Sequence, residues 1–158
     1  LQAQAMSLLR DAVPADFERL AVGLPPQGLL LPEAGLMTAP VAMLIARHCG
    51  TLRARQGWGA CLIVEGDLMV GFVMPKPTDA EGQAEFGYAI SPGQRGRGLA
   101  GAAVGCFVER AAREGLSALL AETDPGNAGS IRVLERNLFT PVPPGGEGRL
   151  RWRRYLRR

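Results

Sequence analysis

Residues 85–100 read Glu85-Phe-Gly-Tyr-Ala-Ile-Ser-Pro-Gly-Gln-Arg-Gly-Arg-Gly-Leu-Ala100, and this stretch decides the fold. Residues 85–90 predict a strand, and Ser91-Pro-Gly ends it because proline lacks an N–H and glycine is permissive in turns. A basic, glycine-rich loop follows, and a helix is predicted from Leu99 to about Glu114. A strand, a glycine loop and a helix N-terminus together expose backbone N–H groups toward an anion, so the stretch predicts a phosphate-binding site.

The loop also contains a pattern typical of dinucleotide-binding proteins. Residues 96–101 match Gly-x-Gly-x-x-Gly, and Glu122 lies roughly 20 residues further on, where an acid would bind a ribose. However, residues 91–95 separate the strand from the glycines, whereas a dinucleotide-binding turn follows its strand almost directly. The chain upstream has the pattern of antiparallel hairpins, and too little chain remains downstream for a second nucleotide-binding half. We therefore keep this interpretation only as an alternative.

The other pattern in the loop is Arg95-x-x-Gly98-x-Ala100, and a second motif lies downstream in Ala121-Glu-Thr-Asp-Pro-Gly-Asn-Ala-Gly-Ser-Ile-Arg-Val-Leu-Glu-Arg-Asn-Leu-Phe139. The first resembles the pyrophosphate loop of the GNAT acetyltransferase superfamily. The second resembles a segment of its branch that contains the ribosomal-protein N-terminal acetyltransferases. Leu8-Leu-Arg, Asp16 and Arg151-Trp also fit that branch. Asn137-Leu138 stands where the family usually has glycine before Phe139, and we expect Asn137 to adopt the left-handed conformation there.

Length and charge limit the possible functions. A chain of 158 residues is expected to form one domain, residues 1–158, with a substantial core. Six arginines lie in residues 149–158, so the rest of the chain carries a net charge of −3, although the whole carries +3. This distribution argues against a general nucleic-acid-binding face. No apolar run approaches the roughly 20 residues that span a bilayer, and no signal peptide is evident, so we expect a cytoplasmic protein without a membrane partner.

Cysteine and histidine offer little chemistry in this sequence. Cys49, Cys61 and Cys106 are odd in number and lack Cys-x-x-Cys spacing, which favours thiols in a reducing cytosol over disulfides or a metal site. His48 is the single histidine, and it lies on a predicted helix far from the glycine loop. We expect a structural role for it and no bound metal.

The fold class follows from the order of the predicted elements. Strands are predicted at residues 7–10, 57–64, 68–74, 85–90, 117–123 and 150–156, and helices at 12–22, 41–55, 99–114 and 127–136. A loop or an irregular helix is predicted at 29–39, and a long loop at 141–148. This order of strands and helices predicts a mixed α+β fold with helices on both faces of the sheet. The resemblance implies a mostly antiparallel sheet containing a β-α-β acyl-CoA-binding unit.

The resemblance also implies a ligand and its binding residues. The ligand is acetyl-CoA, used as a co-substrate. Its pantetheine arm would run along residues 88–90, between two splayed strands, and its pyrophosphate would lie on the glycine loop. The residues expected to bind it are Tyr88, Ala89, Ile90, Arg95, Gly96, Arg97, Gly98, Leu99, Ala100 and Asn127. Asn127 has a structural alternative, because asparagine is among the best helix N-cap residues.

Two residues are candidates for catalysis. Ser130 lies one helical turn after Asn127 on the same face, and in the resembling branch the residue here can protonate the leaving thiolate. A simple contact with the ligand is the alternative. Glu85 is the acid on the central strand and a candidate base for the acceptor amine, with a structural or substrate-orienting carboxylate as the alternative. Strand alternation places Glu85 on the face opposite Tyr88, and which face meets the acceptor stays open.

We therefore expect an N-acetyltransferase that moves an acetyl group directly from acetyl-CoA to a primary amine, of a peptide N-terminus or a small molecule. Nothing at the predicted site resembles an activated Cys or a Ser–His pair, so a covalent enzyme intermediate is not expected. A catalytically silent CoA-binding domain and a dinucleotide-binding module are the alternatives. The arginine-rich end, with Leu150 and Trp152 alternating with arginines, predicts a half-buried edge strand that could pair across a homodimer.

Overall fold

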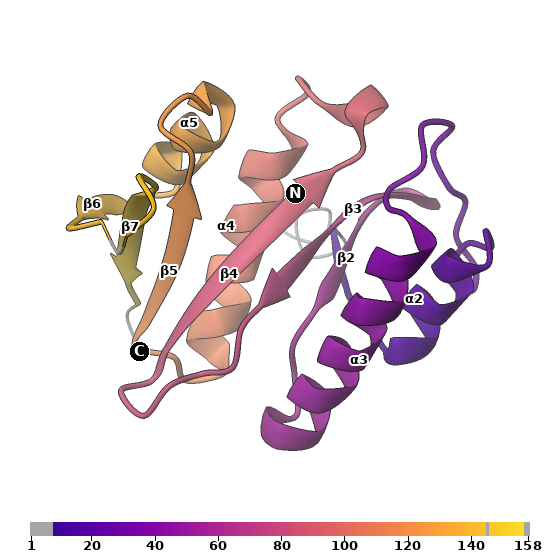
Figure 1. Ribbon diagram of the computed structural model, residues 1–158, viewed down its shortest axis with the longest axis horizontal. Coiled ribbons are helices and arrows are strands. Elements are labelled where there is room, and N and C mark those ends of the chain that lie inside the picture. The colour runs from indigo at the N-terminus through magenta and orange to yellow at the C-terminus, as the bar shows by residue number, and fades with distance from the viewer. Residues whose placement is uncertain (1–7, 145, 157–158) are drawn as a thin grey trace.

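The computed structural model describes residues 8–144 and 146–156, which form a seven-stranded sheet with helices on both faces (Figure 1). The sheet is mixed and mostly antiparallel, as predicted. The strands are β1 (Leu9–Asp11), β2 (Cys61–Glu65), β3 (Leu68–Pro75), β4 (Gln83–Ile90), β5 (Ala118–Thr123), β6 (Thr140–Val142) and β7 (Leu150–Tyr155). The helices are α2 (Pro14–Ala21), α3 (Ala39–Gln56), α4 (Leu99–Arg113), α5 (Ala128–Arg136) and the short 3₁₀ helix η1 (Pro92–Gln94). Ser7, which begins the first predicted strand, lies outside the described residues.

The strand order is β1-β2-β3-β4-β5-β7-β6, and β4 and β5 are the one parallel pair between named strands of the described chain. On its other side β4 pairs with β3 up to its end at Ile90. The β4–β5 pairing stops after three residue pairs, the last of which joins Glu85 to Leu120. Beyond that pair the two strands diverge, as Figure 1 shows. The second half of β4 therefore has a neighbouring strand on one side only.

Helices α4 and α5 cover one face of the sheet. Phe86 on β4 points to this face, and its ring lies 5.2 Å from that of Phe107 on α4 and 5.8 Å from that of Phe139, measured between centroids. Ala103 and Ala111 on α4 are fully buried in the same core. Small residues at these positions let α4 lie close to the strands. The aromatic rings of the strands then pack against the larger side chains of the helix.

Helices α2 and α3 cover the other face, over the first three strands (Figure 1). Phe17 on α2 is fully buried, and its ring lies 6.1 Å from that of Phe72 on β3. Ala46 and Cys49 on α3 are buried against the same cluster. Proline in the first turn of α3 suits its start, and Gly57, with a φ of 82°, ends it in the left-handed conformation. Among the described residues, no helix covers the face of β4, β5 and β7 on this side (Figure 1).

The last part of the sheet differs from the prediction. Residues 141–148 were expected to form a loop throughout, but Thr140–Val142 form β6 and pair with β7. The prediction of β7 as an edge strand is wrong, because β7 lies between β5 and β6. Its Trp152 is buried and donates a hydrogen bond to Thr123 Oγ1 at 3.0 Å. From Arg151 to Arg153, the outer edge of β7 is therefore already paired with β6.

The turn after α5 also differs in detail. Asn137 has a φ of −93°, so the left-handed conformation expected there is absent. The next residue, Leu138, carries it instead, with a φ of 64°. The Asn137 side chain donates to the carbonyls of Gly101 and Val133, which ties this turn to α4. Those two bonds fix the Asn137 side chain between α4 and α5, and Leu138 makes the left-handed turn after it.

Candidate active site

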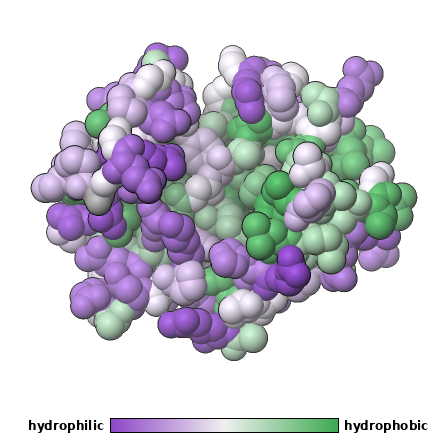
Figure 2. Space-filling view, viewed as in Figure 1, coloured by the Kyte–Doolittle hydropathy of each residue, from purple (hydrophilic) through white to green (hydrophobic). Residues whose placement is uncertain are grey.

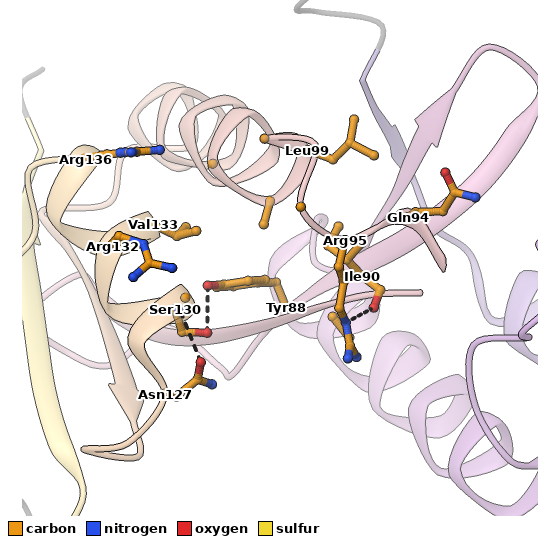
Figure 3. A pocket seen from close by; sticks show the side chains of 16 residues that line it. Tyr88, Ile90, Gln94, Arg95, Leu99, Asn127, Ser130, Arg132, Val133 and Arg136 are labelled. Atoms are coloured by element: carbon orange, nitrogen blue, oxygen red, sulfur yellow. Dashed lines mark hydrogen bonds between the residues drawn. The ribbon is translucent and has the colours of Figure 1, made fainter. Parts of the chain in front are cut away.

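A pocket of about 650 Å³ opens where β4 and β5 diverge. Its walls are the end of β4, the glycine loop, the first turn of α4 and the outer side of α5 (Figure 3). Nine of the ten predicted cofactor-binding residues line it: Tyr88, Ala89, Ile90, Arg95, Gly96, Gly98, Leu99, Ala100 and Asn127. Ser130, a predicted catalytic residue, lines it as well. The structure thus brings together the two motifs, although about 30 residues separate them in sequence.

The glycine loop has the backbone geometry of an anion site. Gly96 and Gly98 have φ values of 79° and 76°, a conformation that costs other residues about 1–2 kcal/mol each. Gly98 is the N-cap of α4. Glycine has no side chain that could accept hydrogen bonds from the first backbone N–H groups of the helix. Arg95 Nε donates to the Ile90 carbonyl at 3.1 Å, which holds this cation against the pocket. The loop can therefore offer backbone N–H groups and a positive charge to a phosphate.

Arg97 differs from its prediction, because it does not line the pocket. Its guanidinium bonds to Gln94 Oε1 at 2.7 Å and to the Glu65 carboxylate at 2.9 Å. Glu65 lies at the end of β2, so the ion pair fastens the loop to the sheet. In this conformation Arg97 orders the loop, and Arg95 is the loop arginine that faces the pocket.

A hydrogen bond crosses the pocket from β4 to α5. The Tyr88 hydroxyl donates to Ser130 Oγ at 3.1 Å, and Figure 3 shows the two side chains pointing toward one another. Burial raises the pKa of Tyr88 above its usual value of 10, and the bond to Ser130 opposes that shift. The tyrosine therefore keeps its proton at neutral pH and holds the Ser130 hydroxyl in place.

Asn127 is the N-cap of α5. Its Oδ1 accepts a hydrogen bond from the Ser130 N–H at 3.2 Å, so the predicted structural role is present. The cap uses the oxygen of the side-chain amide, and its NH₂ group remains able to donate to a ligand in the pocket.

Besides Gly129, three pocket residues on α5 were missed from the sequence: Arg132, Val133 and Arg136. They follow Gly129 at i+3, i+4 and i+7, so helical spacing from the Asn127–Ser130 motif is the signal that finds them. Both arginines are exposed and make no ion pair with another residue in the described parts of the chain. In Figure 3 they project from one side of the pocket, while Arg95 lies on the other. The pocket thus carries positive charge on two walls.

Glu85, the predicted base, lies outside the pocket. It sits at the last β4–β5 residue pair, where the strands begin to separate, and on the face opposite Phe86 and Tyr88. Its carboxylate forms an ion pair with Lys76, and its side chain is 20% exposed. Glu85 is therefore on the side of the sheet away from the pocket, at the narrow end of the opening.

The described residues offer no metal site. Within 8–144 and 146–156, no group of three or more His, Cys, Asp and Glu side chains could hold a metal ion. His48 is exposed on α3, away from the pocket. Cys49 and Cys61 are buried free thiols. No helix in these ranges is long and apolar enough to cross a membrane.

The sequence and the structure both resemble known acetyltransferases. Residues 8–140 match the family described as the acetyltransferase (GNAT) domain. A comparison with curated proteins finds no significant match. The chain belongs to the GNAT acetyltransferase family, and this membership overturns the dinucleotide-binding alternative.

Solved structures share the fold at low sequence identity. The GNAT domain of S. lividans PAT has a TM-score of 0.70 at 19% identity, covering 94% of this chain and 89% of that one. RimL, a ribosomal L7/L12 alpha-N-protein acetyltransferase in complex with coenzyme A, has a TM-score of 0.70 at 18% identity, covering 94% and 93%. Mycobacterium smegmatis RimJ in complex with CoA-disulfide has a TM-score of 0.66 at 20% identity, covering 93% and 80%. These likenesses establish the fold of an acetyltransferase of the GNAT type.

Proposed function

We propose that the protein transfers an acetyl group from acetyl-CoA directly to a primary amine. The observation that carries this proposal is the pocket itself, which joins a phosphate-binding loop to a gap between two strands. The glycine loop and Arg95 would bind the pyrophosphate, and Arg132 and Arg136 would face the remaining phosphate. The unpaired edge of β4 would hydrogen-bond the pantetheine amides, with help from the Asn127 side chain.

The residues around the gap support a short reaction sequence. Acetyl-CoA supplies an activated acetyl group, and a backbone N–H of β4 would polarise its carbonyl. The amine nitrogen forms a bond to the carbonyl carbon, and the carbon–sulfur bond breaks. Ser130 gives its proton to the leaving thiolate and regains one from Tyr88, to which it is bonded, and Tyr88 then takes a proton from solvent. The surplus proton of the amine goes to Glu85, directly or through water, and then to solvent.

A silent CoA-binding domain remains the second candidate. The ion pair between Glu85 and Lys76 favours it, because the carboxylate proposed as the base already has a cationic partner within the chain. Release of free thiol in the presence of an amine separates the two, since a silent domain binds acetyl-CoA without consuming it.

We test the proposal by isothermal titration with acetyl-CoA, CoA and NAD. The variant Arg95→Glu/Gly98→Trp changes the loop at the start of α4. Its matched control, Arg113→Glu/Gly115→Trp, makes the same changes at the other end of α4, where Gly115 has a φ of 87° and, like Gly98, no atom within 4 Å of an added Cβ. Micromolar binding of acetyl-CoA that the first variant loses and the control retains supports the proposal. Binding of NAD without CoA, or of neither, contradicts it.

The location proposed for the protein is the cytosol. Its support is chemical: Cys49 and Cys61 are buried free thiols, as expected in a reducing compartment. Labelling of both thiols in freshly lysed cells under denaturing conditions tests this, and finding them oxidised would contradict it.

A further inference from the structure

The uncovered part of the sheet lies on the side opposite the pocket. Ala121, Thr123 and Trp152 point toward α4 and α5, since Ala121 and Trp152 belong to that core and Thr123 bonds Trp152. Alternation along the strands therefore places Glu122 on β5 and Arg151 on β7 on the other face, with Glu85. Figure 2 shows this face: hydrophilic residues gather over β5 and β7, and hydrophobic residues over α3.

Glu122 and Arg151 are direct partners across the β5–β7 pairing. Opposite charges at such positions have Cβ atoms about 5 Å apart and usually attract each other. In the described ranges, however, neither side chain makes an ion pair or a hydrogen bond. Arg151 Nε is fully buried and has no acceptor. A buried donor without a partner costs about 1–3 kcal/mol, a cost that an acceptor atom supplied by a ligand would remove.

The position of Glu122 links this pair to the reaction. Leu120 is the last residue of β5 that pairs with β4, and Glu122 follows it on the same face. Glu122 therefore stands on the rim of the gap, on the side opposite the acetyl-CoA pocket. Glu85, on the other rim, already holds Lys76, which leaves Glu122 as the carboxylate there without a cation.

We propose that this face binds the acceptor, and that the acceptor is a small zwitterion carrying an amine and an acid group close together. The inference rests on the proposed function. The ammonium group would lie against Glu122 at the gap, and the carboxylate, or another acid group, would lie against Arg151. Arginine suits this role because its planar guanidinium binds carboxylates through two parallel hydrogen bonds. Glu122 and Arg151 are positioning residues that select an amino-acid-like acceptor over a polyamine or a lysine side chain.

The experiment compares free amino acids with their carboxamides and their decarboxylated amines as acceptors at fixed acetyl-CoA. We expect kcat/KM to be at least about tenfold higher for the best free acid than for its carboxamide. A charged hydrogen-bonded pair between the acid group and Arg151 would supply a preference of this size. Arg151→Gln should abolish that ratio by slowing the acid alone, and Arg151→Lys should restore part of it. Arg149→Gln is the control, because Arg149 pairs with Asp124 outside the strand and should leave the ratio intact.

Two results would overturn the inference. One is an equal rate for acid and carboxamide; the other is a preference for Ala-initiated peptides or spermidine that Arg151→Gln leaves unchanged. If no amine is acetylated although acetyl-CoA binds, the proposed function fails, and chemical-shift titration of the CoA-loaded protein then decides the inference. Binding of the acid but not its carboxamide, lost in Arg151→Gln, supports it, and equal binding of both overturns it.

Discussion

Tyr88 and Ser130 are joined by a hydrogen bond of 3.1 Å between their hydroxyl groups, one on β4 and the other on α5. The bond spans the pocket three residues beyond Glu85, where the strands have already stopped pairing. It couples the central strand to the helix that carries the second sequence motif. A hydroxyl that would be a poor acid alone thereby gains a partner that can replace its proton.

Removing either hydroxyl should slow the chemical step. We expect Ser130→Ala and Tyr88→Phe each to lower kcat about 10–100-fold with a smaller change in the KM for acetyl-CoA, because proton transfer matters in the transition state. Because burial raises the pKa of Tyr88, the rate of the parent enzyme should not fall through loss of this proton below pH 10. Tyr155→Phe, at an exposed position outside the pocket, is the control. A change confined to KM would assign the pair to binding alone.

The arginines of α5 make a prediction about the cofactor. If Arg132 and Arg136 bind the 3′-phosphate of CoA, Arg132→Gln and Arg136→Gln should each weaken acetyl-CoA binding about tenfold. Neither should change the affinity for 3′-dephospho-acetyl-CoA, which lacks the group. Titration calorimetry with both ligands gives the comparison. Arg55→Gln, an exposed arginine on α3, should alter neither affinity, and equal losses for both ligands in the α5 variants would remove the 3′-phosphate assignment.

Local patterns in the sequence were sufficient for most elements near the pocket. The glycine loop, the helix after it and the helix after Asn127 depend on turn and capping chemistry, which neighbouring residues determine. The structure gives α4 as Leu99–Arg113 against a predicted 99–114, and α3 as Ala39–Gln56 against 41–55. Ten of the residues predicted for the site line one pocket.

Features that depend on distant parts of the chain could not be predicted in this way. The position of β7 between β5 and β6 depends on pairing with strands from two other segments, so its alternating pattern resembled an edge strand. Arg97 was expected at the phosphate because it lies in the basic loop. Its partner Glu65 lies 32 residues earlier, and no local pattern indicates that contact. Glu85 was correctly placed opposite Tyr88 by alternation, but its partner Lys76 depends on how the preceding loop returns to the strand.

The left-handed conformation of Leu138 makes a prediction about stability. A leucine with a φ of 64° is strained by about 1–2 kcal/mol, and its side chain is 69% exposed, so little packing offsets the strain. We expect Leu138→Gly to raise the free energy of unfolding by about 0.5–1 kcal/mol, after the entropic cost of glycine. Leu24→Gly, at another exposed leucine with ordinary φ, should lower it. Urea unfolding measures both, and destabilisation of the same size in the two variants would refute the strain.

Cys61 should make stability depend on pH in alkaline solution. Burial, with Asp11 nearby, raises the pKa of this thiol from 9.0 to about 12. The unfolded chain loses the proton first, so the stability from this group is complete below pH 9 and disappears as the pH rises toward 12. Between these values Cys61 should lower the free energy of unfolding by up to about 1.4 kcal/mol per pH unit.

Unfolding of Cys61→Ala in urea at stepped pH tests this. The variant should be less stable at neutral pH but should lose less stability between pH 9 and 11 than the parent. Val73→Ala, at the residue paired with Cys61 on β3, removes buried carbon without a titrating group and should keep the parental slope. Identical slopes in all three proteins would show that the thiol ionises equally in both states.

The gap between β4 and β5 is bordered by main chain, because the two strands stop pairing after Glu85 and Leu120. Peptide groups are common to every residue, so mutation changes this border only by changing the path of the chain. A fold of this kind can persist while most side chains change, as the 18–22% identity of several structures with this fold illustrates. The opposite rim, built from side chains such as Glu122 and Arg151, is free to diversify. Point mutations on that rim can therefore change which acceptor binds, while the main chain that borders the donor site stays the same.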